Sequence, residues 1–299
     1  MIGAAASVLV AAVALDLVVG EWPRRIHPVA WFGRIVGRVD SAWRRPRAVG
    51  IAAAIGLPCG AAVVAWGLVH AASSIGPLVG VVVGAVVLFS TVSLRMLLDV
   101  AREVDAAAGR DLAAAREAVR ALVGRNVAEL DAAGLRGATI ESLAENLSDG
   151  FIAPLTAFAV GAQVSVAVGV AAAAWVKAVN TMDSMLGYHD VATGWASARL
   201  DDAAMVVPAR LTAAFLAAAA VRPGALPAAR TDARVPASPN AGWPMATLAT
   251  ALDVRLEKPG HYVLNDGGKP PTGAHVRRAV RTTDVAGLLA AVLAGVVVW

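Results

Sequence analysis

The sequence predicts an all-α fold, a polytopic membrane helical bundle with short or re-entrant segments and cytoplasmic layers of helices and loops. Hydrophobic residues make up 58% of the chain and charged residues only 16%, and the mean hydropathy is +0.65. An average soluble domain has a smaller apolar share and about 25% charged residues. Several apolar runs are also long enough to cross a bilayer. We therefore expect residues 1–299 to form a single integral membrane domain.

The first half of the chain contains three apolar runs of spanning length, at about 2–19, 49–72 and 75–94. The first run lacks a positive amino-terminal region and a small-residue cleavage site, so we interpret it as a retained span. Asp16 within it would be costly against lipid and should face the bundle. Ser73 and Ser74 separate the other two runs, with Pro77 just beyond, which predicts a tight helical hairpin with an uncharged tip.

The loop between the first two spans is rich in arginine and predicts the orientation of the chain. Its arginines are Arg24, Arg25, Arg34, Arg38, Arg44, Arg45 and Arg47. The positive-inside rule makes this loop cytoplasmic. We expect a multi-pass protein of the bacterial inner membrane whose active site lies on the cytoplasmic face. The net charge of +4 does not indicate nucleic acid, because the arginines lie between apolar segments without a recognition-helix pattern.

Two polar layers are expected on the cytoplasmic side, at about 95–149 and 222–283. The first is charged and alanine-rich, and its glycines are predicted to separate short amphipathic helices. These glycines are Gly109, Gly124, Gly134 and Gly137. The second layer is rich in proline and glycine and predicts loops with short helices. The chain has a single cysteine, Cys59, which lies in an apolar stretch. Because there is only one cysteine, a disulfide within the chain is excluded.

Three later apolar segments differ in length and in their predicted relation to the membrane. The run at 151–176 could cross once, or Pro154 and the Gly161–Gln163 interruption could split it into a re-entrant hairpin. We favour the hairpin because polar segments flank it. The short run at 211–221 should dip or dock rather than cross. The segment at 285–299 should end the chain in the membrane.

Three carboxylates at four-residue spacing are the strongest sign of a functional site. Glu141, Glu145 and Asp149 would share one face of a helix with Ser142. Like charges at this spacing destabilise a helix unless a cation such as Mg²⁺ or a basic partner lies between them. We therefore predict that these side chains belong to a site.

A second cluster combines Lys177, Asn180, Asp183 and Ser184 at helical spacing. An ammonium group can bind phosphate, and carboxylate and amide oxygens can bind Mg²⁺. The alternative is an interfacial lysine followed by a helix end, and for Lys177 alone the two interpretations are about equally supported.

A third cluster places Asp201 and Asp202 between Arg199 and Arg210. Surface ion pairs at a helix N-terminal cap are the plain alternative. Arg210 stands at the mouth of an apolar run, where a charge needs a buried partner or an anionic ligand. A polyphosphate that chelates Mg²⁺ would satisfy both signs of charge.

Three smaller motifs could also bind a ligand. His27 and Arg34 open the first cytoplasmic loop, where a turn anchored by Trp31 is an equally good interpretation. Arg125 follows a helix-breaking glycine, and Ser238-Pro239-Asn240 predicts a tight loop that presents a side-chain amide. No phosphate-binding P-loop, nucleophile elbow, paired-cysteine zinc motif or Rossmann fingerprint occurs in the sequence.

In this order, the blocks resemble the adenosylcobinamide-phosphate synthase family of cobalamin biosynthesis. The matching blocks are Asp16 to Glu21, His27-Pro28-Val29 with Trp31 and Gly33-Arg34, Gly124-Arg125, Glu141 to Pro154, Lys177 to Met185 with Gly187-Tyr188, Ser197-Ala-Arg199 with Asp201-Asp202, Pro208-Ala-Arg210, and Ser238-Pro239-Asn240. Each block is weak alone, but the ordered set spans most of the chain and is highly specific.

The resemblance implies an ATP- and Mg²⁺-dependent ligase that joins adenosylcobyric acid to aminopropanol phosphate or to free aminopropanol through an acyl phosphate. The expected catalytic residues are Glu141, Glu145, Asp149, Lys177 and Asp183. The expected substrate- and nucleotide-binding residues are His27, Arg34, Arg125, Asn146, Asn180, Ser184, Arg199, Arg210, Ser238 and Asn240. The expected metal ligands are Glu145, Asp149, Asp183, Asp201 and Asp202. Expected partners are the corrinoid, the amine, membrane lipids and other enzymes of the corrin pathway.

Two other classes of protein remain as alternatives. A membrane transferase acting on a lipid pyrophosphate or CDP-alcohol would also use acidic helices and Mg²⁺, but only Asp149-Gly150 matches the tail of its usual motif. A transporter would also place acids and re-entrant segments in the membrane. Against a transporter, the polar clusters lie at segment ends on one predicted face.

Overall fold

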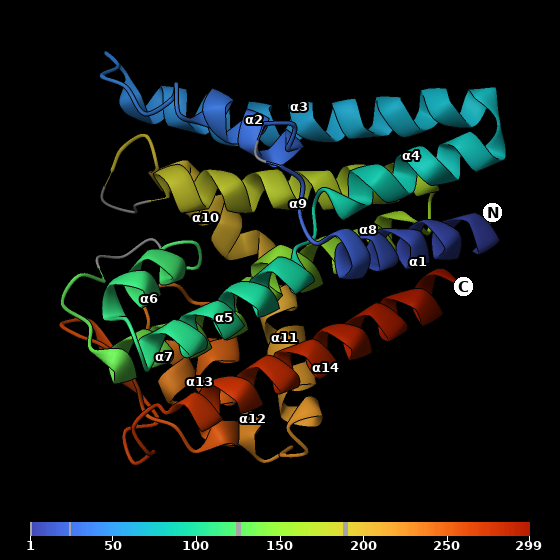
Figure 1. The fold of residues 1–299 in the computed structure, drawn as a ribbon. Coiled ribbons are helices and arrows are strands. Elements are labelled where there is room, and N and C mark those ends of the chain that lie inside the picture. Colours follow the sequence, from blue (N-terminus) through green and yellow to red (C-terminus); the bar gives the residue numbers. More distant parts are fainter. Residues whose placement is uncertain (1, 24, 124–126, 188–190) are drawn as a thin grey trace. The chain divides into compact units, whose positions relative to one another are not determined.

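The computed structural model describes residues 2–23, 25–123, 127–187 and 191–299, and it confirms the all-α prediction. Within these residues, the only paired strands form one short antiparallel hairpin. Figure 1 shows the chain coloured along its sequence, and its contacts divide it into two compact units. Unit 1 comprises Met1–Ser93, Ala153–Met205 and Ala291–Trp299, and unit 2 comprises Leu94–Ile152 and Val206–Ala290.

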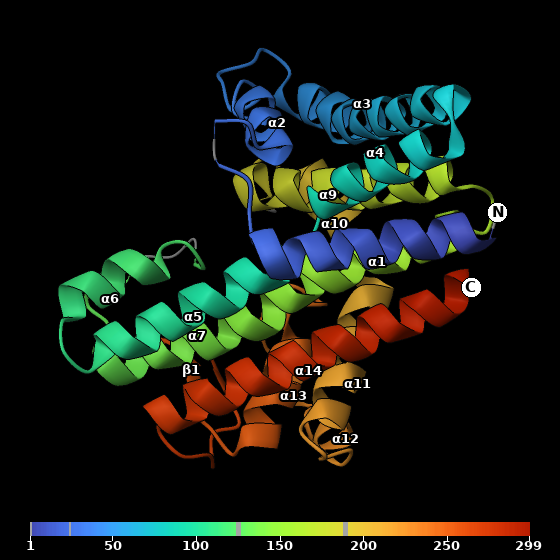
Figure 2. The same ribbon diagram turned by 45° about the vertical axis from the view of Figure 1, so that its right-hand side comes forward.

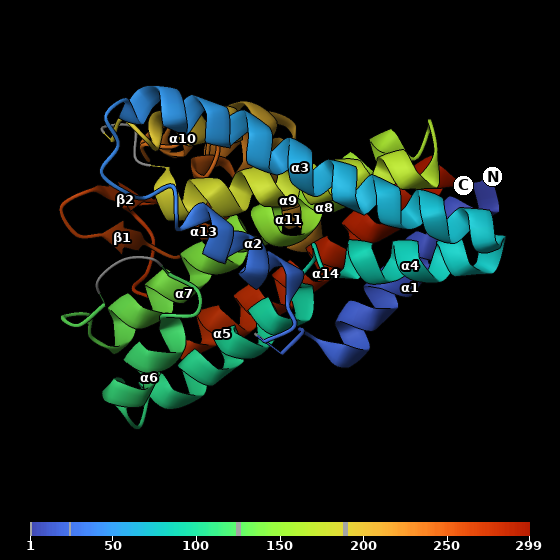
Figure 3. The same ribbon diagram turned by 90° about the horizontal axis from the view of Figure 1, so that it is seen from above.

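Unit 1 is a helical bundle whose centre is the long helix α9. Its helices are α1 (Ile2–Val19), α2 (Pro28–Val36), α3 (Pro46–Ile75), α4 (Pro77–Phe89), α8 (Ala153–Gly161), α9 (Val166–Leu186) and α10 (Trp195–Ala204). Helices α2, α3, α4, α8 and α10 all pack on α9, and Figure 3 shows α3 running along it. Prolines begin α2, α3 and α4, where the missing N–H costs nothing. The hairpin predicted for the second and third apolar runs is present as α3 and α4.

The chain breaks and reverses within the apolar run at 151–176. Helix α8 ends at Gly161, and α9 begins at Val166 after the hydroxyl of Ser165 caps its N-terminus. The two helices pack closely, because a Cβ on Gly161 would lie only 2.9 Å from Gly169 Cα. The predicted interruption is therefore real, and the disposition of this hairpin in a membrane stays a prediction.

Unit 2 packs short helices around α7 and α13. Its elements are α5 (Leu94–Ala108), α6 (Leu112–Val119), α7 (Ala132–Leu147), the π-helical η1 (Ser148–Ile152), α11 (Val206–Ala219), α12 (Ala225–Ala228), the 3-10 turn η2 (Asp232–Arg234), α13 (Gly242–Leu252), β1 (Leu256–Lys258), β2 (Tyr262–Leu264) and most of α14 (Gly273–Val298). Figure 2 shows α5 beside α7, and these helices pack together. Buried Val104, Val119 and Leu135 belong to one core of this unit.

Two predicted boundaries in unit 2 are wrong. Gly134 and Gly137 lie inside α7 and do not separate helices. Gly137 instead allows close packing, since an added Cβ would lie 3.3 Å from the Pro271 side chain. The last helix begins at Gly273 rather than near residue 285, because buried Val276, Ala279 and Val280 extend its inner face among charged residues.

The structure contains helices that fit a membrane protein. Three candidates are long and apolar enough to span, namely Pro46–Ile75, Pro77–Ala108 and Gly273–Val298. Trp195–Ala204 and Val206–Ala219 are a bent pair that would make a fourth span only as one broken helix and is otherwise a re-entrant loop, while Gly3–Val19 is a shorter apolar helix. Asp16 on that first helix is fully buried, as predicted for a carboxylate that avoids lipid.

Candidate functional site

The predicted acidic stripe is partly buried and changes helix type along its length. On α7, Glu141 is only 4% exposed, and Glu145 and Asn146 are half-buried. The Asn146 amide donates to the carbonyl of Leu122 at 3.3 Å. Asp149 lies beyond α7, in the π-helical segment η1. The expectation that all three acids share one α-helical face is therefore wrong for Asp149.

Pro154 gives a physical reason for the π-helical segment. A proline at this position has no N–H for the carbonyl four residues earlier, which belongs to Gly150, and its ring would clash with that carbonyl. The wider π turn at Ser148–Ile152 relieves this conflict just before α8 begins. Such π segments often occur at functional sites. The Ser148 hydroxyl is buried and has no hydrogen-bond partner within the described part of the chain.

Arg210 on α11 is held by the Ser238-Pro239-Asn240 loop, a pairing of two predicted motifs that the sequence did not predict. Its guanidinium donates to the Asn240 side-chain oxygen, to the Pro239 carbonyl at 3.4 Å and to the Val206 carbonyl at 3.0 Å. It also lies 5.2 Å from the centre of the Trp243 ring. The Ser238 hydroxyl accepts from the Asn240 backbone N–H at 3.2 Å and so stabilises the loop. All three acceptors are neutral, so they orient the arginine without neutralising its charge.

The elements that bear these groups pack on one another within unit 2. Helix α11 contacts α13, α7 and η1, and α13 contacts α7. The segment with Asp149 and the helix with Arg210 are thus direct neighbours. An acid and an oriented arginine on adjacent elements suit the binding of a phosphate and its metal ion.

In unit 1, α9 holds Lys177, Asn180, Asp183 and Ser184 in its last turns. The first three are half-buried and Ser184 is exposed. The Ser184 hydroxyl donates to the Asn180 carbonyl at 2.9 Å, so its proton is used within the helix. Asp183 folds over Gly187, where an added Cβ would lie 2.5 Å from the Asp183 Cγ. The carboxylate therefore occupies space that only a glycine leaves open.

Helix α10 carries Arg199, Asp201 and Asp202 of the third cluster, whereas Arg210 lies on α11. Asp201 and Asp202 lie in the C-terminal half of α10, so neither caps its N-terminus. Carboxylates at this end face the negative end of the helix dipole, which favours a role that compensates them with a cation. Arg199 approaches Asp202 only to 3.9 Å and is 62% exposed at its side chain, so this pair adds little stability.

His27 caps helix α2, and both of its ring nitrogens have structural partners. Nδ1 accepts from the Val29 N–H at 3.2 Å, and Nε2 lies 3.1 Å from the Glu21 carboxylate. Because Nδ1 accepts, the proton of the neutral ring belongs on Nε2, which donates to Glu21. Trp31 Nε1 donates to the Arg25 carbonyl, which is the tryptophan-anchored turn that the sequence also allowed. Arg34 on the same helix is exposed.

Several parts of the predicted site stay as predictions or were missed. Arg125, Asn126 and Tyr188 lie outside the described residues. In the described ranges, no three His, Cys, Asp or Glu side chains gather to hold a metal. Sequence reasoning missed the contribution of Trp243 and the packing role of Gly187. The Gly187 position directly after Asp183-Ser-Met-Leu was the available signal, because glycine often follows the last turn of a helix.

Comparisons with known proteins extend over nearly the whole chain. The family described as CobD/Cbib protein matches residues 9–292. The cobalamin biosynthesis protein CobD of Rhodobacter capsulatus is 40% identical over 89% of this chain and 86% of its own length. The same-named protein of Klebsiella pneumoniae is 38% identical over 95% of both chains, and a probable CobD of Methanothrix thermoacetophila is 36% identical over 96% of this chain and 95% of its own. No solved structure matches. The chain belongs to the CobD/Cbib family.

Proposed function

We propose that this protein acts in cobalamin biosynthesis as an ATP- and Mg²⁺-dependent ligase. It joins the free carboxylate of adenosylcobyric acid to the amine of aminopropanol phosphate or aminopropanol. Membership of the CobD/Cbib family supports the pathway, since its relatives bear the name cobalamin biosynthesis protein. The helices of spanning length support a multi-pass membrane enzyme, for which we propose a site on the cytoplasmic face of the bacterial inner membrane.

The observation that most supports phosphate chemistry is the environment of Arg210. Neutral oxygens hold its guanidinium in place, and α11 packs on the π segment that contains Asp149. An oriented and uncompensated arginine suits a phosphate oxygen, on which charge develops during phosphoryl transfer. An amide cannot form from a carboxylate and an amine near neutral pH without activation, so phosphoryl transfer is the chemistry that this ligase requires.

The proposed reaction has two balanced steps. In the first, an oxygen of the corrinoid carboxylate attacks the terminal phosphorus of ATP, and ADP leaves with the electrons of the broken bond. In the second, the amine attacks the acyl carbon and inorganic phosphate leaves. The proton lost by the amine passes to a carboxylate of the protein. We assign this base to Glu141, Glu145 or Asp149 and phosphate binding to Arg210, all of which belong to unit 2.

The available oxygen ligands fit Mg²⁺ in the form in which ATP enzymes usually hold it. Such sites use one or two carboxylates and complete the shell with substrate phosphates and water. Dispersed acids are compatible with this, and a cage made only of protein ligands is not needed. In unit 2, Glu145 or Asp149 would bind the ion, which would neutralise phosphate charge when bound. The candidates within unit 1, taken by itself, are Asp183, Asp201 and Asp202.

One assay tests the proposal against its alternatives. Purified protein in detergent receives ATP, Mg²⁺ and adenosylcobyric acid, with aminopropanol phosphate and aminopropanol in parallel reactions. We expect ADP and the amidated corrinoid in equal amounts. A transferase would instead consume a CDP-alcohol or a lipid pyrophosphate, and a transporter would form no covalent product. Failure of both amines to give amide would refute the ligase.

Arg210→Ala tests the observation on which the proposal depends. Loss of one oriented charge at a transition state typically lowers kcat about 10²- to 10³-fold. Arg230→Ala is the matched control, because Arg230 is an exposed arginine of the same unit. Equal activity of the two variants would remove Arg210 from the phosphate site.

A further inference from the structure

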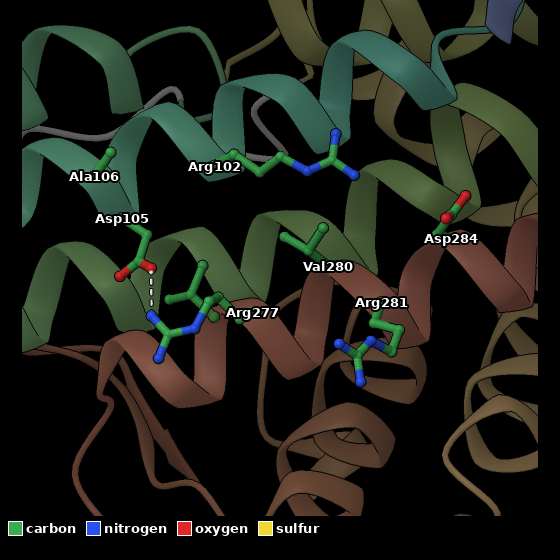
Figure 4. A pocket seen from close by; sticks show the side chains of 8 residues that line it. Arg102, Asp105, Ala106, Arg277, Val280, Arg281 and Asp284 are labelled. Atoms are coloured by element: carbon green, nitrogen blue, oxygen red, sulfur yellow. Dashed lines mark hydrogen bonds and ion pairs between the residues drawn. The ribbon is translucent and has the colours of Figure 1, made fainter.

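A groove in unit 2 has a charged lining that the proposed reaction does not use. Its cavity of about 450 Å³ lies between α5 and α14. The charged residues that line it are Arg102 and Asp105 on α5 and Arg277, Arg281 and Asp284 on α14, which Figure 4 labels. Three arginines against two aspartates leave this lining with one net positive charge.

The ion pairs of the groove make it more receptive to an anion than this count suggests. Asp105 is only 13% exposed at its side chain and already accepts from Arg136 at 3.2 Å and from Arg277 at 3.3 Å. Two positive charges therefore compensate its single negative charge. Arg102 pairs with Asp99 on the surface of α5 at 2.7 Å, where both side chains are more than half exposed. Such a pair is weak, so it leaves Arg102 available to a ligand.

The arginines differ in how firmly they are held. Figure 4 shows Arg277 reaching α5 at Asp105, and Arg102 extending along α5 toward the end of the groove where Asp284 lies. Arg281 points away from α5 in this view. It is exposed and has no partner within the described part of the chain, so rotation about its side-chain bonds can bring it over the groove.

The face of α14 that bears these arginines becomes apolar directly beyond them. Arg277, Arg281 and Val285 follow at four-residue spacing, which places them on one helical face. Val285, Leu288 and Leu289 are 39%, 43% and 39% exposed, and α14 is long and apolar enough to span a membrane. A basic groove next to an exposed apolar face matches the two ends of a phospholipid.

We propose that the groove between α5 and α14 binds the headgroup of an anionic phospholipid. The phosphate lies between Arg102 and Arg281, and an acyl chain follows the apolar face from Val285 to Leu289. Asp284 accepts hydrogen bonds from headgroup hydroxyls, which favours phosphatidylglycerol over phosphatidylcholine, a lipid that has no such donors. This site is independent of the ligase reaction.

Native mass spectrometry of the delipidated protein in detergent tests this site. It compares phosphatidylglycerol with phosphatidylcholine of the same acyl chains, and glycerol phosphate serves as a competitor. An arginine that lies beside the bound headgroup adds roughly fivefold to the affinity for anionic lipid. We expect Arg281→Gln to weaken the binding of phosphatidylglycerol about fivefold. The double variant Arg102→Gln/Arg281→Gln should weaken it about 25-fold.

Arg278→Gln is the matched control, because Arg278 is exposed on α14 and does not line the groove. It should retain wild-type binding, and circular dichroism should show that all variants remain folded. An equal loss in the control, or equal binding of phosphatidylcholine, would overturn the proposal. Displacement of the lipid by millimolar glycerol phosphate would also overturn it, because the groove would then be a site for free phosphate.

Discussion

Gly187 gives the sharpest test of whether the Asp183 carboxylate must be positioned for function. A Cβ at residue 187 would lie 2.5 Å from the Asp183 Cγ and 2.5 Å from its carbonyl oxygen. Carbon atoms in contact are ordinarily about 3.5–4.0 Å apart. Gly187→Ala must therefore move the carboxylate or the end of α9 by roughly 1 Å, the difference between these separations.

The displacement should cost activity more than stability. Overpacking of this size typically lowers the free energy of unfolding by about 1–3 kcal/mol. A reacting group moved by about 1 Å can lose on the order of 100-fold in rate. We therefore expect kcat for amide formation to fall about 100-fold in Gly187→Ala while the protein remains folded in detergent.

A double-mutant cycle isolates the cause. Gly187→Ala should lower kcat much more in the wild-type background than in the Asp183→Ala background, because Asp183→Ala removes the carboxylate part of the clash and leaves only the contact with the residue 183 carbonyl. Gly67→Ala is the matched control, since a Cβ at residue 67 meets nothing within 4 Å. Full activity of Gly187→Ala, or an equal loss in both backgrounds, would refute the argument.

Three further predictions concern other contacts of the structure. Asn240→Asp should keep the fold but raise the KM for ATP, because the new carboxylate would neutralise Arg210; an unchanged KM measured over a range of ATP concentrations would contradict this. Gly161→Val should lower the free energy of unfolding by about 1–3 kcal/mol, because the backbone of α9 lies 2.8 Å from the added Cβ. Denaturant titrations measure this change, and unaltered stability would disprove the close contact. The Lys269 ammonium hydrogen-bonds to Asp253 at 3.0 Å and lowers the pKa of that carboxyl. The pair therefore stabilises the fold at pH values above the unfolded pKa of about 3.9. This stabilisation disappears as the pH falls through the lower pKa of the folded state. Thermal unfolding of wild type and Asp253→Asn should therefore converge in acid, and a constant difference down to pH 2 would argue against the pair.

The sequence alone determined the class of the protein and the positions of most helices. Long apolar runs and starting prolines are local signals, so α3, α4 and the break between α8 and α9 could be predicted from them. Burial of Asp16 was also predictable, because a carboxylate facing lipid is costly. The same local logic placed the acids and arginines of the candidate site at helix ends.

Only the tertiary structure decided how these groups are held. Periodicity assumes a uniform α-helix, and it failed at Asp149 because Pro154 prevents the regular hydrogen bond and a π turn forms before it. The contact of Arg210 with Asn240 joins residues thirty positions apart, and no local pattern determines such a pairing. The groove of α5 and α14 likewise depends on packing between distant segments. Sequence patterns specify which residues can form a helix, whereas contacts through space determine which charges meet.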